Sequence, residues 1–145
     1  MGLLEGLKEP NKKASLVADL VKLIDEQVTG KSGISGLGLK AAYAAVKGVK
    51  PGYIQGAVER LIPEAFKALD PIWSEGVEAG DPVGYLSENA SRAADAMLSV
   101  TDARIATTDN GVVRGAYNKL RKSVKGDVEG AIPSLAKVID NYTKS

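Results

Sequence analysis

Three pairs of carboxylates are the residues best suited to acid–base chemistry in this sequence: Asp25 with Glu26, Glu75 with Glu78, and Asp95 with Asp102. Two carboxylates in unequal surroundings can act as acid and base without a histidine. Asp95 and Asp102 are seven residues apart, which places both on one face of a helix. None of the pairs stands beside a recognisable nucleophile, so we expect no catalytic residues and no enzymatic activity.

The residue types that are missing exclude most other site chemistry. The chain has no histidine and no cysteine, so it has no imidazole base, no thiolate and no metal site built on either residue. The segment Gly30-Lys31-Ser32 resembles the end of a phosphate-binding loop, but Asp25 stands where that loop needs its first glycine. We therefore expect neither a cofactor nor a metal ion.

Length and composition predict a single domain over residues 1–145. The 145 residues are 44% hydrophobic and 26% charged, with a formal net charge of +1, as in ordinary globular proteins. A chain of this length can bury a core that needs no disulfide or metal. No segment has the pattern of a signal peptide or a membrane span, so we expect a cytoplasmic protein.

Helical periodicity runs through the chain. Leu16, Leu20 and Ile24 repeat at the spacing of one helix face, and Asp81-Pro82 is a strong helix start. No alternating segment is long enough for a strand, so the sequence predicts an all-α bundle of about six to seven helices. The expected helices cover residues 11–30, 35–47, 53–69 with a kink at Pro63, a short segment after Asp70-Pro71, 82–106, 112–124 and 131–142.

Two stretches of the sequence have a second copy. Their alignment matches Tyr43 with Tyr117 and Pro63 with Pro133. The matching segments are residues 39–43 with 113–117, and residues 62–70 with 132–140. Because duplicated units bury their apolar faces against each other, we expect two tandem pseudo-symmetric three-helix repeats. These units would cover residues 11–69 and 88–142, with a linker over residues 70–87.

Four charged residues fall at matching places in the two expected units: Asp25 and Asp102, Lys40 and Arg114. We expect Lys40 to pair with Asp25 and Arg114 to pair with Asp102, as one ion pair used twice. The alternative is that all four are solvated surface charges. Tyr43 and Tyr117 lie on apolar helix faces, where we expect a structural role for both rings.

Charge is divided unevenly along the chain. Residues 64–109 hold three basic and nine acidic side chains, a net charge of −6, and residues 110–145 hold seven and three, a net charge of +4. Trp73 lies in the expected linker, and tryptophan is common among interface anchors. The leading hypothesis is a non-catalytic domain that mediates protein interaction or self-association, with a protein partner or as a homodimer. The expected interaction surface consists of Trp73, Glu75, Glu78, Lys119, Lys122 and Lys125.

Three alternatives stay open at this point. Trp73 could pack in the core instead of at an interface. An apolar pocket for a small molecule or a lipid could lie between the two halves. The basic end, residues 114–125, could bind an anion or a nucleic acid, although the nearly neutral chain argues against a nucleic-acid partner.

Three segments also resemble a family of small bacterial proteins of unknown function. They are residues 31–36 leading into Lys40-Ala41-Ala42-Tyr43, then Val49-Lys50-Pro51-Gly52, and then residues 100–104. The likeness covers most of the chain. It implies an all-helical fold and a bacterial source, and it implies no mechanism and no functional residue.

Overall fold

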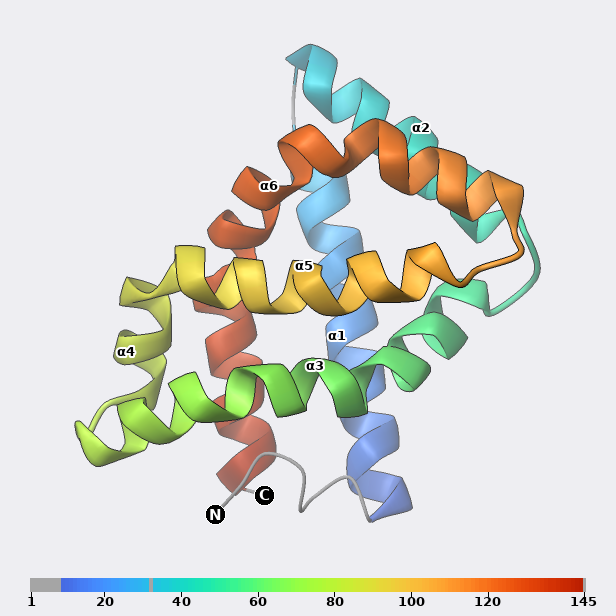
Figure 1. Cartoon of the computed structure of the whole chain (residues 1–145). Coiled ribbons are helices and arrows are strands. Elements are labelled where there is room, and N and C mark those ends of the chain that lie inside the picture. The colour runs from blue at the N-terminus through green and yellow to red at the C-terminus, as the bar shows by residue number, and fades with distance from the viewer. Residues whose placement is uncertain (1–8, 32, 145) are drawn as a thin grey trace.

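The computed structural model describes residues 9–31 and 33–144, except for the side chains of residues 34, 35, 122 and 144. The described residues form six helices and no strand, so the all-α prediction is confirmed (Figure 1). The helices are α1 (Pro10–Gly30), α2 (Gly33–Lys47), α3 (Tyr53–Glu78), α4 (Pro82–Glu88), α5 (Ala90–Ala106) and α6 (Gly111–Lys144).

The helices lie in two crossed pairs with a third pair across one end. In Figure 1, α1 and the last part of α6 lie alongside each other with opposite chain directions, and α3 and α5 cross them. Helix α6 bends, so that its first part lies beside α2. Crossing helices pack side chains from both layers into the space between them, and the core lies there.

The core is built from helices that are far apart in the sequence. Its buried members include Leu16 and Leu20 from α1, Phe66 and Leu69 from α3, and Ile139 from α6. No polar or charged side chain in the described part of the chain is buried. Burial of such apolar surface contributes roughly 25 cal/mol per Å², and this is what holds the crossed pairs together.

Helix α3 continues through both of its prolines, which corrects the prediction of a helix end at residue 69. Pro63 and Pro71 lie inside the helix, and both side chains are exposed. A proline inside a helix costs about 3 kcal/mol because it removes one backbone hydrogen bond and clashes with the preceding turn. Ile72 and Trp73 lie just beyond Pro71 and are both 2% exposed, and their burial offsets that cost.

The expected helix over residues 82–106 is divided at Asn89. The amide of this side chain donates to the Tyr85 carbonyl over 2.8 Å, and such bonds compete with the helical backbone pattern. The predicted start is confirmed, because the Asp81 carboxylate accepts from the Gly84 amide over 3.0 Å and Pro82 follows. The expected linker over residues 70–87 is therefore largely helical, since it holds the end of α3 and nearly all of α4.

Helix α6 is continuous where two helices were expected, over residues 112–124 and 131–142. Pro133 lies inside it with an exposed side chain. Asp127, Val128 and Glu129 in the expected gap are half-buried, and a half-buried backbone needs hydrogen-bond partners that a helix supplies within itself. Helix α6 therefore stays helical over these residues and bends there.

Candidate apolar binding site

A pocket of about 380 Å³ lies between the crossed helices and is partly open to solvent; it is here named the central cavity. Its walls come from α1, α2, α3, α5 and α6 and are mainly aliphatic. They include Leu23, Ile24, Leu39, Val58, Ala65, Met97, Val100, Val128 and Ala131. Ligand pockets in proteins measure roughly 300–1,000 Å³ and have mostly apolar walls, and the central cavity meets both criteria.

Few polar groups reach the central cavity, and most of them are engaged within the chain. The polar residues of the lining are Gln27, which is exposed, and Tyr43, Thr101 and Asp127. Asp127 is ion-paired with Lys31, which lies just after α1. Thr101 lies 2.8 Å from the hydroxyl of Tyr117. Apart from the uncharged Gln27, what remains for a ligand is apolar surface, so the central cavity is suited to hydrocarbon and unsuited to a charged group.

Tyr43 belongs to a polar cluster at the edge of the central cavity. Its hydroxyl donates to the Asp25 carboxylate over 2.5 Å, and the Lys47 ammonium lies 3.6 Å from the same carboxylate. The ammonium is also 5.2 Å from the centre of the Tyr43 ring, a cation–π distance. Burial and the neighbouring carboxylate raise the pKa of Tyr43 well above its usual range, so the hydroxyl stays protonated and keeps donating.

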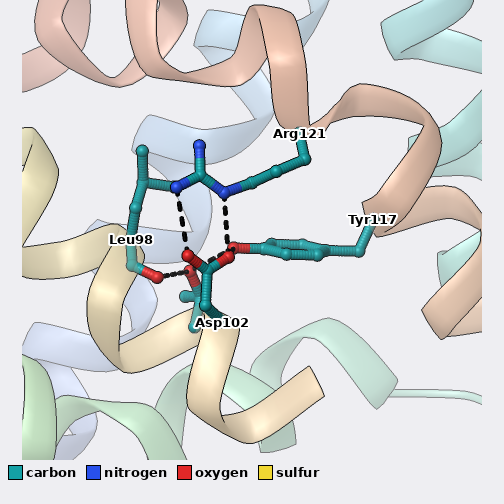
Figure 2. A network of polar contacts seen from close by, with 5 residues as sticks. Leu98, Asp102, Tyr117 and Arg121 are labelled. Atoms are coloured by element: carbon teal, nitrogen blue, oxygen red, sulfur yellow. Dashed lines mark hydrogen bonds and ion pairs between the residues drawn. The ribbon is translucent and has the colours of Figure 1, made fainter. Parts of the chain in front are cut away.

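A second cluster has the same composition. Figure 2 shows Asp102 held by the Arg121 guanidinium, with bonds of 2.8 and 3.0 Å, and by the hydroxyl of Tyr117. The Tyr117 bond measures 2.5 Å. Thr101, which touches the Tyr117 hydroxyl, in turn donates to the Leu98 carbonyl over 3.1 Å. The bonds from Arg121 and then Tyr117 lower the pKa of Asp102.

The cations in the two clusters differ from those expected. Lys47 and Arg121 pair with the aspartates, in place of Lys40 and Arg114. Lys40 is exposed, and Arg114 donates to the Thr108 carbonyl instead. The reason is where the helices meet: a tyrosine reaches each aspartate, and the residue four positions later lies on the same helix face. The alignment of Tyr43 with Tyr117 also aligns Lys47 with Arg121, so the signal was present in the sequence.

A second hollow of about 340 Å³ is lined in part by Tyr117 and is here named the rim hollow. Its apolar wall includes Val46, Ile54, Ala57, Ile105 and Val113. Its polar wall holds two arginines, Arg60 and Arg104, together with Thr107 and Thr108. No carboxylate is among the residues that line it.

Three residues of the expected interaction surface are buried or paired within the chain. Trp73 is 2% exposed and packs in the core, because the continuous α3 turns this residue inward. The Glu75 carboxylate is held by Arg92 with two bonds of 2.9 Å and by the Tyr85 hydroxyl. Lys125 lies 3.0 Å from Asp95 and 3.9 Å from Glu129. Glu78 and Lys119 are exposed, and the side chain of Lys122 lies outside the described residues.

The part of the chain that the structure describes holds neither a candidate metal site nor a candidate membrane span. No group of three or more aspartates and glutamates is gathered there as a metal ion would require. None of the helices described is long and apolar enough to cross a membrane.

Comparison with known proteins identifies a family and no characterised relative. No curated protein and no solved structure matches the chain. Residues 3–143 match a family of unknown function, DUF6918. Because the match covers nearly all of the sequence, the chain belongs to the DUF6918 family.

Proposed function

We propose that this protein binds an apolar small molecule or the hydrocarbon chain of a lipid in the central cavity. The observation that carries the proposal is a space of about 380 Å³ with mostly aliphatic walls, inside a chain of only 145 residues. Monomeric proteins expose few large contiguous apolar surfaces, and those that they expose are often functional. A hydrocarbon ligand would restore the contacts that the cavity walls lack.

The position of the cavity supports the same proposal. Five of the helices contribute to its wall, so a ligand there would contact segments from most of the chain. The two polar clusters lie beside it and hold α1 to α2 and α5 to α6. Bonds of this kind keep a site open by fixing the elements around it.

Protein interaction through the expected surface has weaker support. Its aromatic anchor, Trp73, is buried within the chain, and Glu75 and Lys125 are paired with Arg92 and Asp95. Exposed charges without an apolar centre contribute little to affinity. The geometry therefore supports ligand binding in the central cavity better than it supports protein interaction.

We also infer that the chain arose from two tandem repeats, with the binding site between them. The two aspartate–tyrosine–cation clusters support this, because their tyrosines and cations match at one offset. So does the pair of segments Gly52-Tyr53-Ile54-Gln55-Gly56-Ala57 and Gly126-Asp127-Val128-Glu129-Gly130-Ala131. Ile54 and Ala57 line the rim hollow, and their counterparts Val128 and Ala131 line the central cavity.

The test is binding of an uncharged fluorescent probe, N-phenyl-1-naphthylamine, to the whole protein and to two variants. Ala65→Phe places a ring in the central cavity, since Ala65 lines it. Ala103→Phe is the matched control, because Ala103 is an exposed helix residue. We expect saturable binding by the wild type and the control, and a loss of affinity of roughly tenfold or more in Ala65→Phe, since the ring fills the space.

Two results would contradict the proposal. One is a wild-type protein that gives no saturable fluorescence increase. The other is equal binding by Ala65→Phe and Ala103→Phe, with circular dichroism showing that both are folded. A ligand retained by the protein purified from its natural host, detected by native mass spectrometry, would support the proposal independently.

A further inference from the structure

The rim hollow differs from the central cavity in its charge. Arg60 and Arg104 line it, from the neighbouring helices α3 and α5, and no aspartate or glutamate does. The lining of the central cavity contains no arginine or lysine. Its one charged residue is an aspartate, Asp127, whose carboxylate is ion-paired with Lys31. A local excess of positive charge with apolar walls attracts an anion that also carries a hydrocarbon part.

The two arginines are not neutralised to the same extent as the other cations near the cavities. Within the described residues Arg60 has no ion-pair partner, and its guanidinium lies over the first turn of α3, near Gly56. Arg104 approaches Glu64 only to 4.0 Å, and it donates to the backbone carbonyl of Arg60 over 3.2 Å. That bond holds the two arginines near each other. An arginine presents up to five donors in a planar fork that suits carboxylate and phosphate oxygens.

The two spaces share part of their walls. Leu61 and Thr101 line both the rim hollow and the central cavity, so these two side chains separate them. Leucine side chains change rotamer readily compared with backbone, and Thr101 is a small residue. A flexible chain that passes between them would occupy both spaces.

We propose that the rim hollow holds the anionic head group of a single-chain amphipath, a carboxylate or a phosphate, whose hydrocarbon chain lies in the central cavity. This inference rests on the proposed function and adds the class of ligand and its orientation. Arg60 and Arg104 bind the head group. Arg114, which donates to the Thr108 carbonyl at the wall of the rim hollow, is a positioning residue for that wall.

The experiment compares three ligands of equal chain length in displacing N-phenyl-1-naphthylamine: decanoate, decyl phosphate and decanol, at pH 8. Decanoate and decyl phosphate carry the two candidate head groups, and decanol carries none. In the wild type we expect the better of the two anions to displace the probe at a concentration roughly tenfold lower than decanol. The anion that displaces better identifies the head group.

Variants then test whether the stronger displacement by the anion depends on Arg60 and Arg104. The double variant Arg60→Gln/Arg104→Gln should lose the preference for the anion and should keep the wild-type affinity for decanol. Lys137→Gln is the control, because it removes one exposed positive charge from α6 outside both linings. It should leave all three affinities unchanged.

The failures of the two proposals are distinguishable. Equal displacement by decanol and by both anions, with Ala65→Phe still weakening all three, would overturn the head-group site and leave the proposed function in place. Loss of decanol affinity together with anion affinity in the double arginine variant would also overturn it. No displaceable binding of the probe by the wild type would overturn both.

Discussion

Tyr43 and Tyr117 make the same contact in different parts of the chain, since each donates its hydroxyl to an aspartate carboxylate over 2.5 Å. Each ring is half-buried, and each aspartate belongs to the helix that precedes the tyrosine. A cation four residues after the tyrosine completes each cluster. The two clusters therefore connect helices in pairs, α1 with α2 and α5 with α6; Tyr43 lines the central cavity and Tyr117 lines the rim hollow.

The first prediction concerns the two hydroxyls. Tyr43→Phe and Tyr117→Phe each remove one hydrogen bond to a carboxylate and keep the ring. We expect each to lower the free energy of unfolding by about 1 kcal/mol, and the double variant to lose the sum because the clusters share no residue. Urea unfolding measures this. Tyr53→Phe is the control, with no side-chain hydrogen bond among the contacts described, and a loss equal to theirs would contradict the assignment.

The second prediction compares how much Asp102 and Asp25 contribute to the free energy of unfolding. Arg121 holds Asp102 with two bonds of 2.8 and 3.0 Å, whereas Lys47 only approaches Asp25 to 3.6 Å. Two-bond arginine–carboxylate pairs are the stronger kind. We therefore expect Asp102→Asn to cost about 1 kcal/mol and Asp25→Asn about half as much, since both carboxylates are partly solvated. Equal losses would show that the arginine geometry adds nothing.

The third prediction concerns the loss of thermal stability at low pH. Hydrogen bonds from Arg92, and then from Tyr85, lower the pKa of Glu75 from its ordinary value of 4.5 to about 2. A carboxylate with a lowered pKa stabilises the fold above pH 4.5, and this stabilisation is lost as the pH falls toward 2. Thermal unfolding between pH 5 and pH 2 should show a smaller decrease in midpoint for Glu75→Gln than for the wild type. Glu78→Gln, an exposed neighbour, should behave as the wild type does, and a similar change in both variants would contradict the assignment.

The helical class follows from the sequence because apolar periodicity is local, whereas the helix boundaries depend on distant contacts. In the sequence, Pro71 predicts a helix end. The helix nevertheless continues, because Trp73 beyond it is buried by contacts that only the folded chain provides. Asn89 read alone is one polar residue in a helical segment, and the structure divides the helix there. Local signals therefore gave the element type. Tertiary packing decided that α3 continues past Pro71, whereas the division at Asn89 goes with a local bond from its side chain to the Tyr85 carbonyl.

The clusters were predictable in part, and an apolar pocket was an open alternative whose position and lining the sequence does not give. Sequence comparison identifies Asp25, Asp102 and both tyrosines, and it aligns Lys47 with Arg121, but only the helix crossing decides which cation reaches which aspartate. The central cavity arises where packing between five helices is incomplete. No short motif encodes such a space, because it depends on side chains such as Leu23 and Val128 that are about a hundred residues apart.

The fourth prediction tests the place of Trp73. With the ring 2% exposed, Trp73→Ala should lower the free energy of unfolding by about 3–5 kcal/mol, as large aromatic truncations in cores do. Trp73→Phe, which keeps a ring, should cost clearly less. Sedimentation at low and high ionic strength should give the same mass for Trp73→Phe as for the wild type. If a Trp73 variant changed the mass found by sedimentation and left the free energy of unfolding unchanged, Trp73 would lie at an interface and not in the core.

The fifth prediction tests how closely the end of α3 approaches α4. Gly76 is buried, and a methyl group there would lie 2.8 Å from the Cα of Pro82 and 3.0 Å from the Cβ of Tyr85. Neither atom is the end of a flexible side chain, so α4 would have to move. Its start is held in place by the Asp81 amide, which donates to the Gly76 carbonyl over 3.1 Å. Gly76→Ala should therefore cost about 1–3 kcal/mol through overpacking.

The matched control for this variant is the same substitution at Gly115. It lies in the exposed part of α6, and a methyl group there would meet no atom within 4 Å outside its own helix backbone. Alanine is the better helix former, so Gly115→Ala should raise the free energy of unfolding by about 0.5–1 kcal/mol. The two variants differ only in what surrounds the added methyl group. If urea unfolding gave them the same sign, the close approach of α3 and α4 would be wrong, and the inward position of Trp73 in the last turns of α3 would need another explanation.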